Sequence, residues 1–250
     1  MSTTPVVAAQ VPEAPTPINH FARIIGVFFS PKSTFEDIAQ RPSWVIPVLL
    51  MTVLGLVMAV VMNQKIDWRD VASKRIEESP RAANLSAEQK EQQIAMSAKI
   101  SPGFVYGFGL FGPILGVLIV AAVLLLAYNV IGGAGANFSV SMGIVSHAYL
   151  VTIVSTLLFI LILFLKPPGT LDLDNPVATN IGAFLPDTTP KAFMALARSI
   201  DIFNIWILLL IATGFAAFNP KKLKGKALSI VVAMWAIWVA VKMGSAWIFS

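Results

Sequence analysis

The chain has 250 residues, of which 56% are hydrophobic and only 12% are charged, and its mean hydropathy is +0.77. This composition is typical of an integral membrane protein and excludes an ordinary water-soluble enzyme. The net charge is +5 and cysteine is absent, which excludes disulfides, thiolate nucleophiles and metal sites with cysteine ligands.

The first segment, residues 1–18, is predicted to be a disordered tail. Residues 1–17 contain four prolines and a single charged residue, so they form no amphipathic face. They also lack the basic start and the apolar core of a signal peptide.

Two short interfacial helices on the cytoplasmic side are predicted over residues 19–43. In the first, apolar residues recur at helical spacing beside His20 and Arg23, as in a helix lying on a membrane surface. Ser30-Pro31 breaks this helix, and Ser33 with Glu36 predicts a capping box for the second. A solvated helix ahead of the membrane is the simpler interpretation, and the alternative is a partner-binding surface. Its expected contact residues are Phe28, Phe29, Lys32, Phe35, Glu36 and Asp37.

A membrane domain with five transmembrane helices is predicted over residues 44–250, because about 20 apolar residues cross a bilayer. Residues between Lys99 and Lys166 carry no charge, and this stretch divides at its glycine-rich centre. The expected spans are 44–62, 104–131, 143–165, 202–218 and 227–249. The fold class is therefore an all-α polytopic bundle.

Two long connectors, 63–102 and 166–199, are expected to be exposed. The first has mixed charge and predicts two exposed helices, the second of which would start at a Ser86–Gln89 capping box. The other connector is rich in proline and mostly irregular, and Thr189 before Pro190 predicts a helix start.

The fourth and fifth spans are joined by a basic turn that is expected to lie at the membrane surface. With a cytoplasmic N-terminus, the inside segments carry seven Lys and Arg and the outside connectors ten, which opposes the positive-inside rule. The N-inside orientation is still preferred because the turn is dense, adjoins two spans and contains no acid. Its basic residues are Lys221, Lys222, Lys224 and Lys226.

Polar groups within the spans are costly and are candidates for function. Asp201 and Lys242 lie at similar distances from the basic turn, which predicts an intramembrane ion pair. Alternatively, Lys242 reaches the outer interface and Asp201 caps its helix. His147 is expected to be a packing residue, and a proton relay is the weaker alternative.

Small residues on the second span predict close helix packing. Gly109, Gly112 and Gly116 share one face, and a GxxxG spacing lets another helix approach. Packing within the chain and a dimer contact are both compatible with this pattern.

Four segments together resemble bacterial members of the Yip-domain family, the Ypt/Rab-interacting membrane proteins. They are FFSPKSTFEDIAQRPSW over 28–44, NPVATNIG over 175–182, SIDIFNIW over 199–206 and the basic turn leading into 225–227. The resemblance implies five spans, a cytoplasmic N-terminus and no catalytic site. For some bacterial relatives it also implies an accessory role beside ABC-type exporters.

The sequence favours a non-enzymatic membrane scaffold or adaptor in a bacterial inner membrane. No catalytic motif is present, and no cofactor, metal or nucleic acid is expected. The expected partners are the lipid bilayer and another membrane protein, which could be an ABC-type exporter or a second copy of the chain. An accessory subunit of such an exporter and a small transporter or channel are the alternatives.

Overall fold

The computed structural model describes residues 17–167, 169–186 and 188–248, so most of the predicted tail lies outside the described residues. Over the described residues the chain is helical, with one isolated antiparallel β-bridge between Asn180 and Asp201, and the all-α prediction is confirmed. In chain order the elements are α1 His20–Phe29, α2 Pro31–Gln40, α3 Val45–Lys65, α4 Trp68–Glu77, η1 Pro80–Asn84, α5 Ala87–Val130, α6 Phe138–Ala148, α7 Val151–Leu165, η2 Ile181–Phe184, α8 Lys191–Ser199, α9 Ile202–Phe218, α10 Pro220–Leu223 and α11 Ala227–Ile248.

Four helical segments in the described residues are long and apolar enough to cross a membrane: Val45–Lys65, Ala87–Val130, Phe138–Leu165 and Ala227–Ile248. Only 22% of each apolar window is buried inside the chain, so lipid or other proteins must cover the rest. The remaining expected span, the fourth in chain order, is α9, an apolar helix of 17 residues, which is at the short limit for a crossing. The chain is a multi-pass membrane protein.

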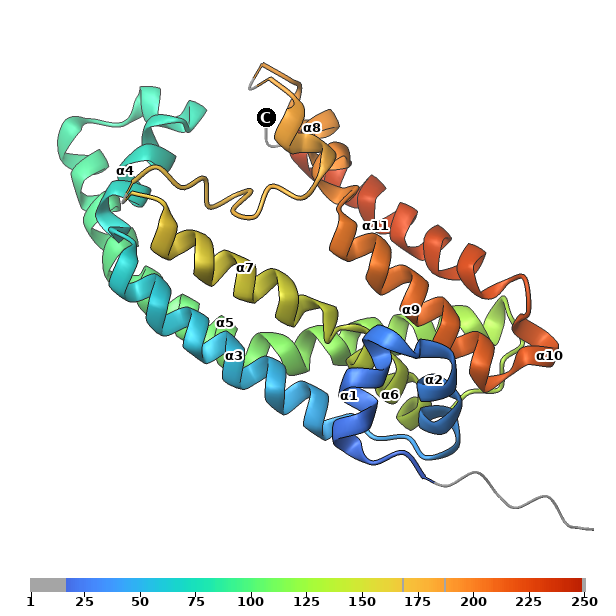
Figure 1. The fold of residues 1–250 in the computed structure, drawn as a ribbon. Helices are drawn as coiled ribbons and strands as arrows, with labels where there is room; N and C mark the ends of the chain where they lie inside the picture. Colours follow the sequence, from blue (N-terminus) through green and yellow to red (C-terminus); the bar gives the residue numbers. More distant parts are fainter. Residues whose placement is uncertain (1–16, 168, 187, 249–250) are drawn as a thin grey trace, which may run out of the picture.

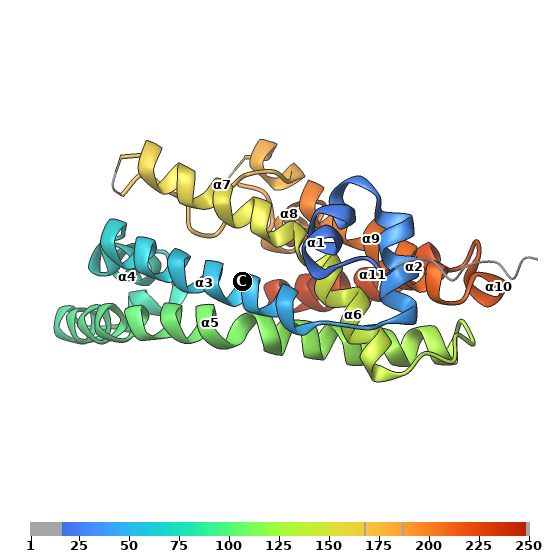
Figure 2. The same cartoon turned by 60° about the horizontal axis from the view of Figure 1, so that its bottom comes forward.

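The helices form two groups that meet at one end. Helix α3 packs along α5 and α7, while α11 packs against α8 and α9. Helices α1, α2 and α6 lie where the groups converge, and α4 and α8 lie toward the opposite end (Figures 1 and 2). The largest core cluster accordingly joins α2, α5, α6, α9 and α11.

Helix α5 differs from its prediction. The Ser86–Gln89 capping box is present, but the helix that it starts runs without interruption to Val130. We expected a separate exposed helix in the connector before the second span. The structure shows that this helix and the second span are parts of one helix, α5. Pro102 and Pro113 lie inside this helix and do not end it.

Two predicted helix starts are wrong. Helix α2 begins at Pro31 with Ser30 in the capping position, and the Ser33 hydroxyl donates back to the Ser30 carbonyl. Helix α8 begins after Pro190, and the hydroxyl of Thr189 donates to the Pro186 carbonyl. In α2 the proline occupies the first helical position, which suits its fixed φ, whereas in α8 Pro190 is itself the N-cap residue and the helix starts one residue later than predicted.

The link from α5 to α6 requires glycine. Gly133 and Gly135 have φ values of 63° and 68°, which residues with a Cβ rarely adopt. The Asn129 side chain closes this turn by accepting from the Ala136 amide and donating to the Ala136 carbonyl, both at 2.9 Å. The short connection thus leaves no backbone group of Ala136 unpaired within the membrane region.

Helices α3 and α5 approach most closely at a pair of glycines. A Cβ added to Gly109 would lie 2.7 Å from the carbonyl oxygen of Gly55. The atoms nearest to a Cβ on Gly112 would belong to the Phe108 ring of its own helix, and a Cβ on Gly116 would meet nothing within 4 Å. Of the three predicted packing glycines, Gly109 is therefore the one that lies against the backbone of another helix.

The glycine contact predicts different effects for two substitutions on the same helix. Gly109→Ala should lower the free energy of unfolding by about 1–3 kcal/mol, because the methyl group collides with backbone that cannot rotate away. Gly116→Ala, the matched control, should be neutral or stabilising, since it adds helix propensity at an open position. Thermal unfolding in detergent measures both. Equal melting temperatures for the two variants would contradict the close contact.

Candidate functional site

The N-terminal helices α1 and α2 form a hairpin that is inserted into the end of the bundle. Val27, Phe35 and Ile38 are fully buried and belong to the main core cluster. A Cβ on Gly214 of α9 would lie 2.5 Å from Cγ2 of Ile144 and 3.0 Å from the Phe35 ring, so this glycine leaves room for both side chains. The sequence predicted that α1 lies on the membrane surface. In the structure, one face of the α1–α2 hairpin instead packs against other helices of the chain.

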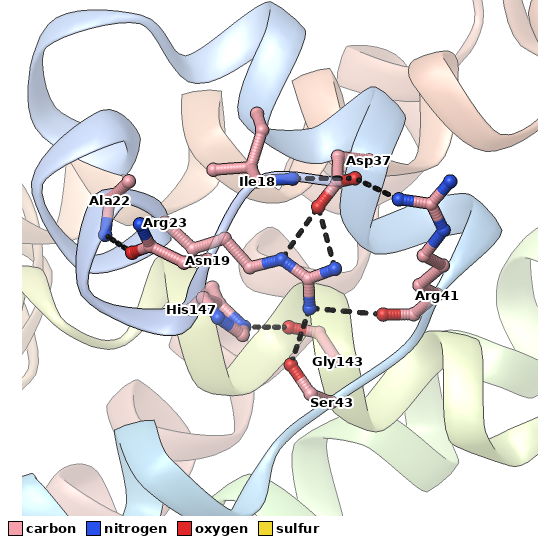
Figure 3. A network of polar contacts seen from close by, with 9 residues as sticks. All are labelled: Ile18, Asn19, Ala22, Arg23, Asp37, Arg41, Ser43, Gly143 and His147. Carbon is pink, nitrogen blue, oxygen red and sulfur yellow. Dashed lines mark hydrogen bonds and ion pairs between the residues drawn. The ribbon is translucent and has the colours of Figure 1, made fainter. Parts of the chain in front are cut away.

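The hairpin is held by a buried guanidinium. Arg23 is 3% exposed, and its Nε donates to Oδ2 of Asp37 at 2.6 Å, with Nη2 also 2.6 Å from that oxygen. Its Nη1 donates to the Arg41 carbonyl at 3.0 Å and to the Ser43 hydroxyl at 2.7 Å (Figure 3). One side chain from α1 therefore ties together α2 and the segment that leads into α3.

Asp37 is the acceptor at the centre of the network. Its side chain is 11% exposed, and besides Arg23 it accepts from the Ile18 amide at 3.3 Å and from Arg41 at 3.4 Å. A buried carboxylate is tolerated only when its charge and its lone pairs are matched in this way. Asp37 therefore serves as the anchor of the hairpin.

The expected partner-contact residues divide into two sets. Phe35 and Asp37 are used inside the hairpin, and the partly buried Phe28 packs edge-on against Trp206 at 5.7 Å between ring centroids. We expected these three residues to contact a partner at the surface, but in the structure their side chains make contacts within the chain. Phe29, Lys32 and Glu36 are exposed, with Phe29 at 83%.

A row of apolar side chains on α1 adds to the exposed set. Phe21, Ile25 and Phe29 follow one another at helical spacing and are 72%, 45% and 83% exposed. We call the five residues Phe21, Ile25, Phe29, Lys32 and Glu36 the platform surface.

His147 on α6 packs beneath the hairpin. It is 1% exposed, and its Nδ1 donates to the Gly143 carbonyl at 2.8 Å (Figure 3). A proton relay would need polar partners, and the nearest candidates in the sequence, Tyr128 and Asn129, bond elsewhere. The Tyr128 hydroxyl donates to the Ala227 carbonyl, and the Asn129 amide donates to the Ala136 carbonyl. These contacts fit the packing interpretation of His147.

At the opposite end, Asp201 and Lys242 each have another partner. Asp201 caps α9 by accepting from the amides of Phe203 and Asn204, as the capping alternative expected. Lys242 Nζ donates to the Ser199 hydroxyl at 3.1 Å. The ion pairs of the described residues do not include Asp201 with Lys242, so that direct pair stays a prediction.

The basic turn is exposed and anchored from below. Lys221, Lys222, Lys224 and Lys226 all point to the surface, while Leu223 between them is fully buried. The Asn219 amide donates to the Ala134 carbonyl at 2.9 Å, so the turn is fastened to the α5–α6 link. In the described part of the chain, no group of three or more potential ligand side chains is placed to hold a metal ion.

Sequence reasoning missed Arg23 as the key residue of this site. Its helical position beside apolar residues suggested a polar residue at the membrane surface. One feature of the sequence could have indicated the Arg23–Asp37 contact. Arg23 lies on the first short helix and Asp37 on the second, and Ser30-Pro31 between them allows the two helices to fold back on each other.

The comparisons with known proteins give one result. The family model described as the Yip1 domain matches residues 25–244, which is most of the chain. No curated protein and no solved structure matches.

The buried network predicts a large effect of removing its cation. Arg23→Met should destabilise the protein by about 3–5 kcal/mol, because the mostly buried Asp37 then keeps only the longer contact with the partly exposed Arg41 as its cation partner. The double variant Arg23→Met/Asp37→Leu should recover much of this loss, since neither charge then remains. Thermal unfolding in detergent provides the measurement.

Lys32→Met is the matched control for this prediction, because Lys32 is an exposed cation in the same hairpin. It should change stability by no more than about 0.5 kcal/mol. The network would lose its assigned role if Arg23→Met unfolded at the same temperature as Lys32→Met.

Proposed function

Because the chain belongs to the Yip1 domain family, we propose that it is a non-enzymatic membrane scaffold that binds another membrane protein through the platform surface. The partner would meet this surface at the cytoplasmic face of the membrane. It would present apolar side chains to α1 and opposite charges to Lys32 and Glu36.

The observation that supports this function best is the rigid mounting of an exposed surface. Arg23 fixes α1 to α2 and to the start of the first span, and Phe35 fills the core beneath them. Large aromatic side chains that are held in place lose little entropy on binding, and they are typical of interface centres. Phe21 and Phe29 are the large aromatic side chains that this anchored helix exposes.

A charge pair beside the apolar row favours a protein over lipid alone. An anionic leaflet attracts lysine but repels glutamate, so Glu36 gains nothing from a lipid contact. Lys32 and Glu36 lie four residues apart on α2 and are both exposed. A protein surface can match both charges, which gives the contact its specificity.

We further propose a cytoplasmic N-terminus in a bacterial inner membrane. The platform and the basic turn at α10 lie toward the same end of the bundle (Figure 1). Several basic residues of the long connectors are neutralised in ion pairs, namely Arg69 with Glu91, Lys74 with Asp70, Arg75 with Asp174 and Arg198 with Asp172. The lysines of the turn have no such pair among the described contacts, so their pull toward the cytoplasmic leaflet is stronger than the raw charge count suggests.

The scaffold proposal is tested by purifying the full chain in a gentle detergent and identifying the proteins that copurify in a fixed ratio. Phe29→Ala/Lys32→Glu/Glu36→Lys should reduce the recovery of the specific partner by about tenfold or more, because it removes an aromatic anchor and reverses both charges. Recovery of an ABC-type exporter would specify the accessory role.

The matched control is Phe164→Ala, which removes an exposed apolar ring from α7, outside the platform. It should leave the partner recovery unchanged while the chain remains folded. Equal recovery with the platform variant would refute the proposed surface, and recovery of the chain alone would indicate self-association in its place.

Reporter fusions test the orientation. A reporter that is active only outside the cytoplasm should give signal when it is fused after Ser250, because five crossings from a cytoplasmic start end outside. The same reporter inserted between Lys222 and Leu223 should be silent. The opposite pattern would invert the orientation.

A further inference from the structure

A cavity of about 800 Å³ lies at the opposite end of the molecule from the platform. It is lined by α7, α8, α9 and α11, together with the connector over 174–180. Two kinds of lining residue matter for what it could bind. These are cationic side chains from α8 and α11, and apolar side chains from α8 and α9.

The connector that covers this cavity is held in one conformation. Asn175 and Asn180 exchange side-chain hydrogen bonds, the Thr179 hydroxyl donates to Asp201, and the Ile202 amide donates to the Thr179 carbonyl at 3.4 Å. Ala178 between them has a φ of 55°, an uncommon conformation for a residue with a Cβ. Strained residues persist only where their surroundings hold them, so the cover is preorganised.

The Lys242 ammonium lies in the lining of this cavity and makes fewer hydrogen bonds within the chain than it has protons to donate. The residue lies within α11, is half-buried, and donates to Ser199, although an ammonium has three protons to donate. Three acids line the cavity. Asp201 caps α9 and Asp174 pairs with Arg75, and the ion pairs of the described residues do not join Glu78 to Lys242. A charge at membrane depth is costly without a counter-ion, which favours an anion beside Lys242.

A second donor lies in the same lining. Arg198 on α8 pairs with Asp172 at 3.5 Å through Nη2, but its Nε is buried and has no hydrogen-bond partner among the described residues. Because Nε has almost no accessible surface, a ligand in the cavity would meet the accessible part of this side chain, which is 33% exposed. Lys242 and Arg198 are the residue types that bind a phosphate group.

The lining also includes a group of apolar side chains, which can accept a hydrocarbon part of the ligand. Met194, Phe203 and Ile207 line the cavity together with the phosphate-binding candidates. The hydroxyls of Thr152 and Ser155 also face this region, but they donate to carbonyls of their own helical segment. A free inorganic anion would leave these apolar side chains unmatched.

We propose that this cavity binds an anionic phospholipid, with the phosphate beside Lys242 and Arg198 and the start of an acyl chain along Phe203 and Ile207. The site is distinct from the platform surface, and its occupation would join α8, α9 and α11 to α7. The ligand would act as a bridge between the two helix groups at the end where they diverge (Figure 1).

Binding is tested with the purified full chain in neutral detergent, by native mass spectrometry and thermal unfolding during titration with phosphatidylglycerol or phosphatidylcholine. Phosphatidylglycerol should bind more tightly and raise the melting temperature more. Lys242→Gln should weaken its binding by about tenfold, the loss expected for one charge-assisted hydrogen bond. Equal binding of the two lipids, or unchanged binding by the folded Lys242→Gln variant, would overturn the proposal.

Lys222→Gln is the matched control, because it removes an exposed lysine of the basic turn and leaves the cavity intact. Its affinity for phosphatidylglycerol should stay within about twofold of the unchanged protein, as for other surface substitutions. A tenfold loss in this variant would place the lipid at the turn and overturn the cavity site.

Two further measurements cover the remaining outcomes. If inorganic phosphate alone stabilises the protein and phosphatidylglycerol adds nothing, the ligand is a free anion and the lipid assignment is wrong. If Lys242→Gln does not fold, a photoactivatable phosphatidylglycerol is used on the unchanged chain. Crosslinks to the peptide that contains Met194, Phe203 and Ile207 support the site, and crosslinks confined to other helices refute it.

Discussion

The contact between Arg23 and Asp37 is the constraint on which the arrangement of the N-terminal half depends. A guanidinium has donors on three nitrogens in one plane, so it can serve Asp37, the Arg41 carbonyl and Ser43 together. Lysine could carry the charge but could not supply this geometry. Because Ser43 lies just before α3, the same side chain that closes the hairpin also sets where the first span begins.

The two ends of the bundle are held by different forces. At the platform end, apolar contacts dominate, with Phe35, Ile144 and Phe215 fully buried where the helix groups converge. At the far end, the long connectors are joined by polar contacts, such as the bond from Lys74 to the Gly169 carbonyl. Exposed ion pairs contribute little to stability, so this end is the one where a bound ligand has most effect.

Much of the fold follows from hydropathy, because long apolar runs have few alternatives in a membrane protein. The span at 202–218 coincides with α9, and the Ser86 capping box was identified from its spacing alone. The burial of Arg23 could not be predicted in this way. Its local pattern is the same for a helix on a membrane surface and for one packed into a bundle, and the difference lies in Asp37, 14 residues away across a proline break. The platform was therefore located in the sequence, while the division of its residues into buried and exposed sets required the structure.

The hydroxyl groups within the membrane helices also favour a scaffold over a transport path. Ser141 donates to the Ala121 carbonyl on a neighbouring helix, and Thr213 donates to the Leu209 carbonyl of its own helix. A hydroxyl that is committed to backbone is not free to replace the water around a cargo molecule. Lys242 has donors to spare, and it lies toward the C-terminal end of α11, where a bound molecule can remain. Such a placement suits a structural ligand, because transport requires sites that continue from one face of the membrane to the other.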